Sequence, residues 1–444
     1  MLEVLANRTY RYLFAAQVIA LIGTGLMTVA LGLLAYQLAG DKAGSVLGTA
    51  LAIKMVAYVG IAPLIGGFTG RLPRRAFLVS MDVLRASVAV ALPFVDQVWQ
   101  IYVLIFLLQS ASAAFTPTFQ ATIPDILPDE RVYTRALSLS RLAYDLENLL
   151  SPTLAAALLT VISFHSLFGG TVFGFIVSAL LILTVSLPQA AITERQQSFF
   201  EKATRGMRIY LATPRLHGLL ALNLSVAAAG AMVIVNTVVL VRGLLGGSNG
   251  DVAMALACFG GGSMVSALVL PRVLDRLDDR TVMIPAAGLL AILLFAFGGA
   301  TAMMQAGPLW GVLLVLWTSM GLCYSAVMTP TGRLLRRSAQ AEDRPALFAA
   351  QFALSHGAWL ITYPVAGWFG TLFGMTATAL VLAAITLLGV FLAVTYWPAG
   401  DPDVLEHAHP DLPERHPHFA TSVGGRHAHP FVIDDYHRRW PNDA

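Results

Sequence analysis

The stretch Thr116-Pro117-Thr118 recurs 213 positions later as Thr329-Pro330-Thr331. The acidic-acidic-Arg triplet Asp129-Glu130-Arg131 recurs as Glu342-Asp343-Arg344 at the same offset of 213. Two short patterns that share one offset indicate an internal duplication. Each copy spans about half of the 444 residues, so the repeated unit is a whole bundle of helices and not a short solenoid repeat.

The composition indicates that these bundles lie in a lipid bilayer. Hydrophobic residues make up 57% of the chain and charged residues only 12%, whereas soluble domains carry roughly 25% charged residues. A helix that crosses the hydrocarbon core needs about 20 mostly apolar residues, and twelve segments qualify, six in each copy. These segments are 10–39, 45–69, 76–95, 100–124, 137–161, 166–187, 215–241, 252–274, 282–304, 308–329, 346–369 and 373–397. We therefore expect an all-α membrane protein with twelve transmembrane helices in two pseudo-symmetric six-helix bundles.

Positive charge is divided unequally between the two sides of the predicted membrane protein. Of the 28 Lys and Arg residues, 23 fall in the N-terminus, the alternate loops and the C-terminal tail on one side. Only Lys42 and Arg242 fall on the other side. The positive-inside rule then places both termini in the cytoplasm of a protein of the inner (cell) membrane. The first apolar segment is too long for a cleaved signal peptide. Because the charges follow the topology, the net charge of +3 does not indicate a nucleic-acid partner.

Two changes of composition divide the chain into four parts. Residues 188–214 interleave charged and aromatic side chains, which predicts a cytoplasmic linker with an amphipathic surface helix. After Trp397-Pro398 the chain is rich in Pro, His, Asp and Arg, which predicts a tail that is disordered or only locally ordered. The parts are an N-terminal six-helix bundle (1–187), the linker (188–214), a C-terminal six-helix bundle (215–397) and a His-rich cytoplasmic tail (398–444).

Two six-helix bundles joined by a charged linker resemble the major facilitator superfamily. That family carries a Gly, Asp-Arg, Gly-Arg-Arg signature between its second and third spans, where this chain has Gly66-Gly67-Phe68-Thr69-Gly70-Arg71-Leu72-Pro73-Arg74-Arg75. Gly70 replaces the family's Asp, which helps to latch the two halves, whereas Asp275-Arg276 keeps it in the second copy. The resemblance implies a gating role for this loop set, and topogenic charge with a structural Asp82–Arg85 ion pair is the alternative. The set is Arg71, Arg74, Arg75, Asp82, Arg85, Asp275 and Arg276.

Further runs resemble one exporter branch of that superfamily. They extend from Phe115-Thr116-Pro117 to Leu127-Pro128 and, in the linker, from Gly206 to Leu211. The branch includes macrolide efflux pumps, siderophore exporters and nickel-resistance permeases, and the resemblance covers residues 5 to 397. It implies export, and it leaves the substrate open.

Charged side chains inside the fifth predicted span are candidates for substrate or proton binding, because a charge at mid-bilayer costs about 2.5–3.5 kcal/mol. Arg141 and Asp145 are four residues apart, so they can neutralise each other, and a purely structural pair is the alternative to a binding role. Glu147 points about 200° away from Asp145 around the helix. We expect Glu147 to carry protons or bind substrate unless a basic group from another helix pairs with it.

His356 and Lys54 complete the predicted midplane site. The repeat offset places His356 opposite Ala143, near the depth of Asp145, and substrate sites in such transporters lie near the midplane between the repeats. Imidazole suits proton coupling or a borderline metal ion, and a core histidine bonded to a neighbouring helix is the alternative. Lys54 falls in the outer part of its predicted span, where a long side chain can snorkel to the interface, so it is a secondary candidate.

The tail carries histidines with metal-ligand spacing. Seven of the ten histidines follow residue 400, and six of them form three His-x-His pairs. Such pairs can bind Ni²⁺, Co²⁺ or Zn²⁺, although the fixed spacing of a zinc finger is absent and the site would be labile. A solvated, pH-responsive tail is the alternative. The predicted ligands are His407, His409, His416, His418, His427, His429 and His437.

Together these features predict a secondary active transporter that exports a divalent transition metal, nickel first, by proton antiport with alternating access. Nickel-resistance permeases of the resembled branch also carry a His-rich C-terminus. An exporter of a drug or siderophore, with the tail as an accessory, is the alternative. We expect no resident cofactor, and the partners are the lipid bilayer, protons and a small ion or molecule that a monomer can carry.

Two other classes of protein are alternatives to a transporter: a metal-sensing receptor on a transporter scaffold and an intramembrane enzyme. The predicted spans contain no His-Glu-x-x-His or Gly-x-Ser-x-Gly pattern, and the chain has no Gly-x-x-x-x-Gly-Lys-Ser/Thr loop. We therefore expect neither an enzyme nor an ATP-driven pump.

Overall fold

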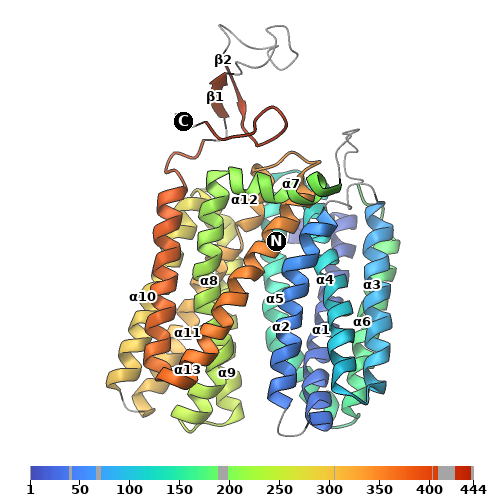
Figure 1. The fold of residues 1–444 in the computed structure, drawn as a ribbon, viewed down its shortest axis with the longest axis vertical. Helices are drawn as coiled ribbons and strands as arrows, with labels where there is room; N and C mark the ends of the chain where they lie inside the picture. The colour runs from blue at the N-terminus through green and yellow to red at the C-terminus, as the bar shows by residue number, and fades with distance from the viewer. Residues whose placement is uncertain are drawn as a thin grey trace.

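The structure, a computed structural model, describes residues 2–39, 43–66, 72–188, 199–304, 306–402, 404–408 and 426–441. Within these residues the fold is two bundles of long helices that stand side by side (Figure 1). Nine of the described helices are long and apolar enough to cross a membrane. Three more segments of comparable length, namely α2, α5 and the first part of α13, run alongside them, which is consistent with the twelve expected spans.

The N-terminal bundle contains the first six long helices. A 3₁₀ turn (Leu2–Ala6) precedes them, and another (Leu92–Phe94) follows the third. The helices are α1 (Arg8–Ala39), α2 (Ala43–Gly66), α3 (Arg74–Ala91), α4 (Val98–Ile126), α5 (Glu130–Leu159) and α6 (Phe164–Leu183).

The C-terminal bundle follows a short surface helix, α7 (Phe199–Ala212), which lies across one end of the molecule. The remaining helices are α8 (Pro214–Val238), continued by a π-helical turn (Val239–Leu244), α9 (Asn249–Leu274), α10 (Asp279–Met303), α11 (Ala306–Met328), α12 (Thr331–Arg337) and α13 (Arg344–Tyr396). Most buried apolar residues of this bundle form one core cluster that begins at Ile209 of α7 and continues to Leu405, Phe431 and Ile433 of the tail. The linker thus contains a helix, α7, that packs on the second bundle.

The two repeated triplets begin equivalent helices. Asp129 is the N-cap of α5, and its carboxylate accepts a hydrogen bond from the Val132 backbone N–H at 2.9 Å. Asp343 occupies the N-cap position of α13. The repeated prolines differ, because Pro117 lies inside α4 whereas Pro330 lies between α11 and α12. The duplication thus holds for helix starts, and the second copy has an additional break.

A glycine divides α13 into its two predicted spans. Gly374 has φ +80° and ψ 171°, which no other residue type adopts without strain, and the helix direction changes there. The expected spans 346–369 and 373–397 therefore meet at a glycine hinge with no intervening loop.

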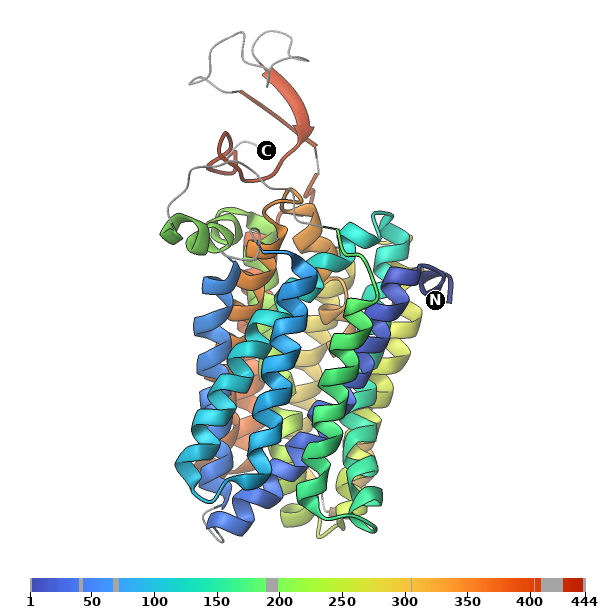
Figure 2. The ribbon, with the colours of Figure 1, turned by 90° about the vertical axis from the view of Figure 1, so that its right-hand side faces the viewer.

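The tail contains local order that the composition allowed for. Strands β1 (Val404–Ala408) and β2 (Arg426–Pro430) form an antiparallel ribbon. Figure 2 shows this ribbon beyond the same end of the molecule that carries α7 and the N-terminus. We call this end the tail face and the other end the opposite face.

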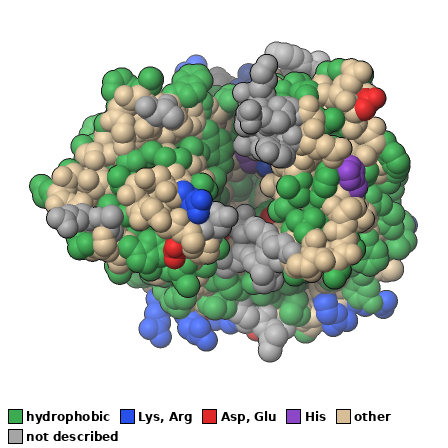
Figure 3. Space-filling view, turned by 90° about the horizontal axis from the view of Figure 1, so that it is seen from below, with side chains coloured by type: hydrophobic (Ala, Val, Ile, Leu, Met, Phe, Trp, Pro, Cys, Tyr) green, Lys and Arg blue, Asp and Glu red, His purple; other side chains and the backbone are tan. Residues whose placement is uncertain are grey.

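The two bundles touch mainly through five helices. α5 packs on α9, and α13 packs on α2 and α4. Seen from the opposite face, the molecule is hollowed between the bundles (Figure 3). On the tail face, ion pairs join the two bundles, among them Arg344 with Asp125 at 2.9 Å and Arg333 with Glu130 at 2.8 Å. The structure is thus closed at the tail face and open toward the opposite face.

Candidate functional site

Arg141, Asp145 and Ser263 form a polar cluster where α5 meets α9. The Arg141 guanidinium pairs with the Asp145 carboxylate, as the four-residue spacing predicted. Ser263 of α9 donates a hydrogen bond to Asp145 Oδ2 at 2.7 Å and accepts one from Arg141 Nε at 3.2 Å. The guanidinium also lies over the Tyr324 ring, 4.9 Å from its centre. The pair therefore also connects the two halves, which local spacing did not indicate.

Glu147 lies on a different part of α5 from Asp145, as its predicted direction requires. It is half-buried, and its Cγ atom lies beside Gly25 of α1. The Lys54 ammonium of α2 attracts the Glu147 carboxylate electrostatically. Lys54 is thus a basic group from another helix that acts on Glu147, as the sequence left open.

Lys54 does not occupy the position expected from the sequence. Its ammonium lies 5.4 Å from the centre of the Tyr58 ring, four residues away on α2, and it interacts electrostatically with both Glu147 and His356. Because α2 runs from Ala43 to Gly66, Lys54 lies near the middle of the helix. The expectation that Lys54 snorkels to the outer interface is therefore wrong, and its role as a site candidate becomes stronger.

His356 lies on α13 among aromatic rings at the contact with α2. Its ring centre is 4.2 Å from that of Phe352 and 4.7 Å from that of Tyr58, the latter in an edge-to-face arrangement. Its Nδ1 atom lies 2.7 Å from the Phe352 carbonyl oxygen. The histidine is held by its own helix and by Tyr58, so both of its sequence interpretations stay open.

The structure does not bring Asp145 into contact with His356. Asp145 lies at the α5–α9 contact, whereas His356 lies at the α2–α13 contact. Tyr144 lies between them on α5 and interacts electrostatically with Glu147, Tyr58 and Arg141. The residues of the composite site predicted from the repeat therefore lie at two separate helix contacts, and the site stays a prediction.

Sequence reasoning missed residues that lie next to these candidates. Tyr58 donates a hydrogen bond to Gln109 Oε1 at 2.8 Å while its ring contacts His356 and Lys54. Tyr144 and Ser263 were also missed. The signal for Tyr58 was its position four residues after an intramembrane lysine, on the same helix face.

The residues of the predicted gating set differ in their surroundings. Asp82 and Arg85 form the expected pair. Ser178 donates a hydrogen bond to Asp82 Oδ2 at 2.8 Å. The Arg85 guanidinium lies between the rings of Phe115 and Phe175.

The other members of the set lie nearer the tail face or outside the described residues. Arg74 is buried and pairs with Asp125 at 2.7 Å. Asp275 pairs across the halves with Arg131 at 3.8 Å. Arg75 and Arg276 are exposed, and Arg71 lies outside the described residues.

Asp125 is an inter-bundle carboxylate that the sequence did not reveal. It binds Arg74 of its own bundle and Arg344 of the other bundle. It stands between Pro124 and Leu127-Pro128, inside the run that resembled the exporter branch. Asp125 therefore provides the first copy with an inter-half carboxylate, although Gly70 stands at the family's usual position.

The tail histidines are only partly described. His409, His416 and His418 lie outside the described residues. In the ribbon, the Cα atoms of His407 and His427 are register partners. The ring centres of His429 and His437 are 5.0 Å apart, and His437 Nδ1 lies 2.9 Å from Asp434 Oδ1. Among the described residues, no group of three or more His, Cys, Asp or Glu side chains is arranged to hold a metal ion.

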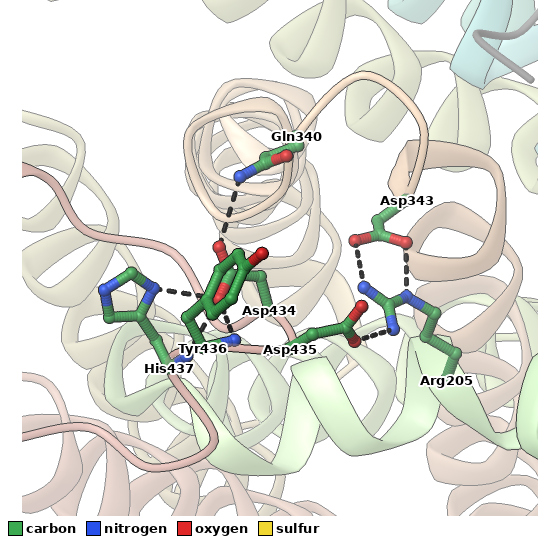
Figure 4. Close-up of polar contacts among 7 residues, drawn as sticks. All are labelled: Arg205, Gln340, Asp343, Asp434, Asp435, Tyr436 and His437. Carbon is green, nitrogen blue, oxygen red and sulfur yellow. Dashed lines mark hydrogen bonds and ion pairs between the residues drawn. The ribbon is translucent and has the colours of Figure 1, made fainter. Parts of the chain in front are cut away.

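The segment that follows β2 is docked on the tail face (Figure 4). Arg205 of α7 binds Asp343 through two hydrogen bonds and Asp435 through a third at 2.8 Å. Gln340 donates to Asp434 Oδ2 at 3.3 Å. Burial lowers the pKa of Arg205, but its bonds to these aspartates outweigh burial, so its pKa is raised and it stays charged. The tail is therefore attached to the linker and to the second bundle.

Comparisons with known proteins agree with this architecture. The family model of the Major Facilitator Superfamily matches residues 13–297 and 220–421 of this chain. Macrolide efflux protein A of Streptococcus pyogenes is 26% identical over 220 residues, which are 48% of this chain and 53% of that protein. Multidrug resistance protein MdtG of Dickeya zeae is 29% identical over 158 residues, 35% of this chain and 38% of that protein. The chain thus spans about half the length, or less, of these curated relatives.

A solved structure extends the agreement to the whole fold. The crystal structure of the human organic anion transporter MFSD10 superposes with a TM-score of 0.71 over 87% of this chain and 99% of that one, at 15% identity. The curated relatives carry the names of drug exporters, and the narrower nickel-resistance branch stays a prediction. Because the family match covers most of the chain, this multi-pass integral membrane protein belongs to the Major Facilitator Superfamily.

Proposed function

We propose that the chain exports a bulky, amphipathic organic solute in exchange for protons, by alternating access. The observation that carries this proposal is the seam between α2 and α13. There the rings of Tyr58, Phe352 and His356 adjoin the opposite charges of Lys54 and Glu147. Aromatic rings offer a large apolar surface, and a few polar groups among them fix orientation, which is typical of sites for organic ligands.

The direction of transport rests on topology and on the relatives. Basic side chains are concentrated toward the tail face, so we assign that face to the cytoplasm of the inner membrane. The structure then represents the outward-open state. The names of the macrolide and multidrug relatives support export of an organic solute.

Glu147 and Lys54 supply the proposed coupling. An ionised Glu147 neutralises Lys54 inside the membrane, where an isolated charge is costly. When a proton from outside binds a Glu147 oxygen, this attraction ends and the solute is released to the outside. After the tail face opens, loss of the proton to the cytoplasm restores the pair, and the next solute binds. Proton and solute thus favour different states of one charge pair.

The test uses everted membrane vesicles and a radiolabelled macrolide. Accumulation by the wild type should require an imposed proton gradient, and Glu147→Gln should abolish the gradient-dependent part. The control is Glu3→Gln, because Glu3 is exposed and pairs with Arg135 far from the seam. Gradient-dependent accumulation that survives in Glu147→Gln would contradict the coupling, and no macrolide accumulation in the wild type would contradict this solute class.

Export of a divalent metal, nickel first, is the second candidate. The register that sets His407 opposite His427 favours it, because cross-strand neighbours lie about 5 Å apart and a ribbon can present two imidazoles to one ion. Isothermal titration with Ni²⁺ of the full chain and of a chain ending at residue 400 separates tail binding from a site in the body. Radioactive nickel flux that is equal in wild type and in Glu147→Gln, His356→Ala would exclude the seam as a metal site.

A further inference from the structure

A cavity of about 430 Å³ lies on the tail face, away from the seam site. Each part of the molecule contributes to its wall. The first bundle provides the start of α5, the second provides α12 and the start of α13, and the tail provides the end of β2 and the next residue. The lining residues are Glu130, Tyr133, Arg333, Arg336, Arg337, Arg344, Pro430 and Phe431.

The lining has an excess of positive charge. It contains four guanidinium groups and one carboxylate, that of Glu130. Carboxylates of the surrounding structure compensate three of the four: Arg333 pairs with Glu130 and Asp279, Arg337 with Asp279, and Arg344 with Asp125.

Arg336 is the guanidinium whose charge is not compensated. Among the residues that the structure describes, no carboxylate pairs with it. One of its nitrogens donates to the Pro128 carbonyl oxygen, and the guanidinium lies 5.5 Å from the centre of the Tyr133 ring. A neutral carbonyl and an aromatic ring are weaker partners for a cation than an oxyanion.

Unsatisfied donors surround this guanidinium. Arg336 Nη1, Arg344 Nε and Tyr133 Oη are buried and have no hydrogen-bond partner within the described part of the chain. Tyr133 is 0% exposed, and both guanidiniums interact electrostatically with its hydroxyl. Buried polar atoms are rarely left unpaired, and guanidinium can only donate. The missing partner should therefore be an acceptor with negative charge.

We propose that this cavity binds a phosphate-bearing anion, either a free phosphorylated small molecule or the headgroup of an anionic lipid. Guanidinium groups match phosphate oxygens with two parallel hydrogen bonds, and the Tyr133 hydroxyl can donate a further one. The volume lies within the range of small-molecule sites. The ligand bridges α5 of one bundle to α12 and α13 of the other.

This position gives the ligand a regulatory effect. The cavity is complete only while the bundles are together at the tail face, so the anion stabilises that closed state over the state open at the tail face. The docked tail covers the cavity through Pro430 and Phe431, and it is anchored by the Arg205, Asp343 and Asp435 contacts (Figure 4). Ligand exchange is therefore coupled to movement of the tail.

The first experiment measures binding of radiolabelled inorganic pyrophosphate to the purified full chain in detergent, at constant ionic strength adjusted with NaCl. Binding should saturate, and Arg336→Gln and Tyr133→Phe should each weaken it about tenfold, the effect of one lost hydrogen bond to a charged group. Tyr133→Phe removes one oxygen only, so it keeps the test informative if Arg336→Gln does not fold. The matched control is Arg208→Gln, because Arg208 is exposed on α7 and outside the cavity.

A second experiment distinguishes the two sources of phosphate. The melting temperature is compared in nanodiscs of phosphatidylglycerol and of phosphatidylcholine. A higher value in phosphatidylglycerol that is lost in Arg336→Gln, together with no pyrophosphate binding, assigns the site to lipid. Saturable pyrophosphate binding with no lipid effect assigns it to a soluble anion. The proposal is overturned if neither ligand has an effect, or if both cavity variants behave as Arg208→Gln does.

Discussion

The Arg344 guanidinium lies 2.9 Å from the Asp125 carboxylate, and this ion pair joins the second bundle to the first at the tail face. Asp125 also binds Arg74 at 2.7 Å, so one carboxylate holds two cations from two halves. Arg131, which is equivalent to Arg344 in the repeat, pairs with Asp275 of the opposite half at 3.8 Å. The arginine of each triplet thus pairs with a carboxylate of the opposite bundle, and separating the bundles breaks both contacts.

Asp125→Asn should shift the conformational equilibrium toward opening at the tail face. The change leaves Arg74 buried without a carboxylate and weakens the hold on Arg344, and hydrogen bonds to charged groups contribute about 1.5–3 kcal/mol each. We expect at least a tenfold change in the ratio of the two states. Spin labels at Arg75→Cys and Arg276→Cys, both exposed at the tail face, report it in a background with Cys258 and Cys323 replaced by Ser.

The control for this measurement is Asp278→Asn. Asp278 is exposed at the start of α10, and its side chain makes no capping hydrogen bond. If Asp125→Asn leaves the distance distribution between the labels as Asp278→Asn does, Asp125 is not a latch.

Asp82→Leu should destabilise the first bundle more than Asp82→Leu combined with Arg85→Met. Asp82 is 0% exposed, and its removal leaves the Arg85 guanidinium between the Phe115 and Phe175 rings without a counter-charge. Breaking a buried pair on one side costs about 3–5 kcal/mol, whereas replacing both partners by apolar groups is often near neutral. Melting temperatures in detergent measure the difference, and additive losses would show that the pair is not energetically coupled.

Gly25→Ala should destabilise the packing of α1 against α5. A Cβ atom at this position would overlap the Oγ and Cβ atoms of Ser151, and overpacking of this kind costs about 1–3 kcal/mol. Ser151→Gly in the same chain removes both atoms and should recover part of the loss. The control on the same helix is Gly32→Ala, where a Cβ meets nothing within 4 Å. Equal melting temperatures for the two alanine variants would contradict the close contact.

The parts of the fold that depend on local spacing could be read from the sequence. The Asp82–Arg85 and Arg141–Asp145 pairs follow from positions three and four residues apart on a helix, and the structure contains both. The two repeated triplets lie at the starts of α5 and α13, whereas the predicted spans began later, at residues 137 and 346. These features require no knowledge of how the helices pack.

The contacts between distant helices could not be read in this way. The contact of Arg344 with Asp125 joins residues 219 positions apart, and Lys54 reaches Glu147 from another helix. The predicted location of Lys54 was wrong because its depth depends on where α2 begins. The direction of its side chain depends on the neighbouring Tyr58 ring. Docking of the tail by Arg205 also depends on a carboxylate far along the chain, Asp435.

Docking of the tail should weaken at low pH because of Asp434. Burial raises its pKa, but hydrogen bonds from the His437 side chain and from the backbone N–H groups of His437 and Tyr436 more than offset this, and they lower its pKa to about 2. A lowered pKa means that the stabilisation of the docked tail, about 2 kcal/mol, is fully present above the ordinary aspartate value near 3.9. It is lost as the pH falls through about 2.

The rate of pepsin cleavage between about pH 5 and pH 2 measures the fraction of molecules whose tail is undocked. At pH 5 the tail of Asp434→Asn should be cut at least tenfold faster than that of the wild type, and this ratio should approach one at pH 2. Asp96→Asn, an exposed aspartate between α3 and α4, is the control, and a ratio that stays constant over this pH range would show that Asp434 does not hold the tail.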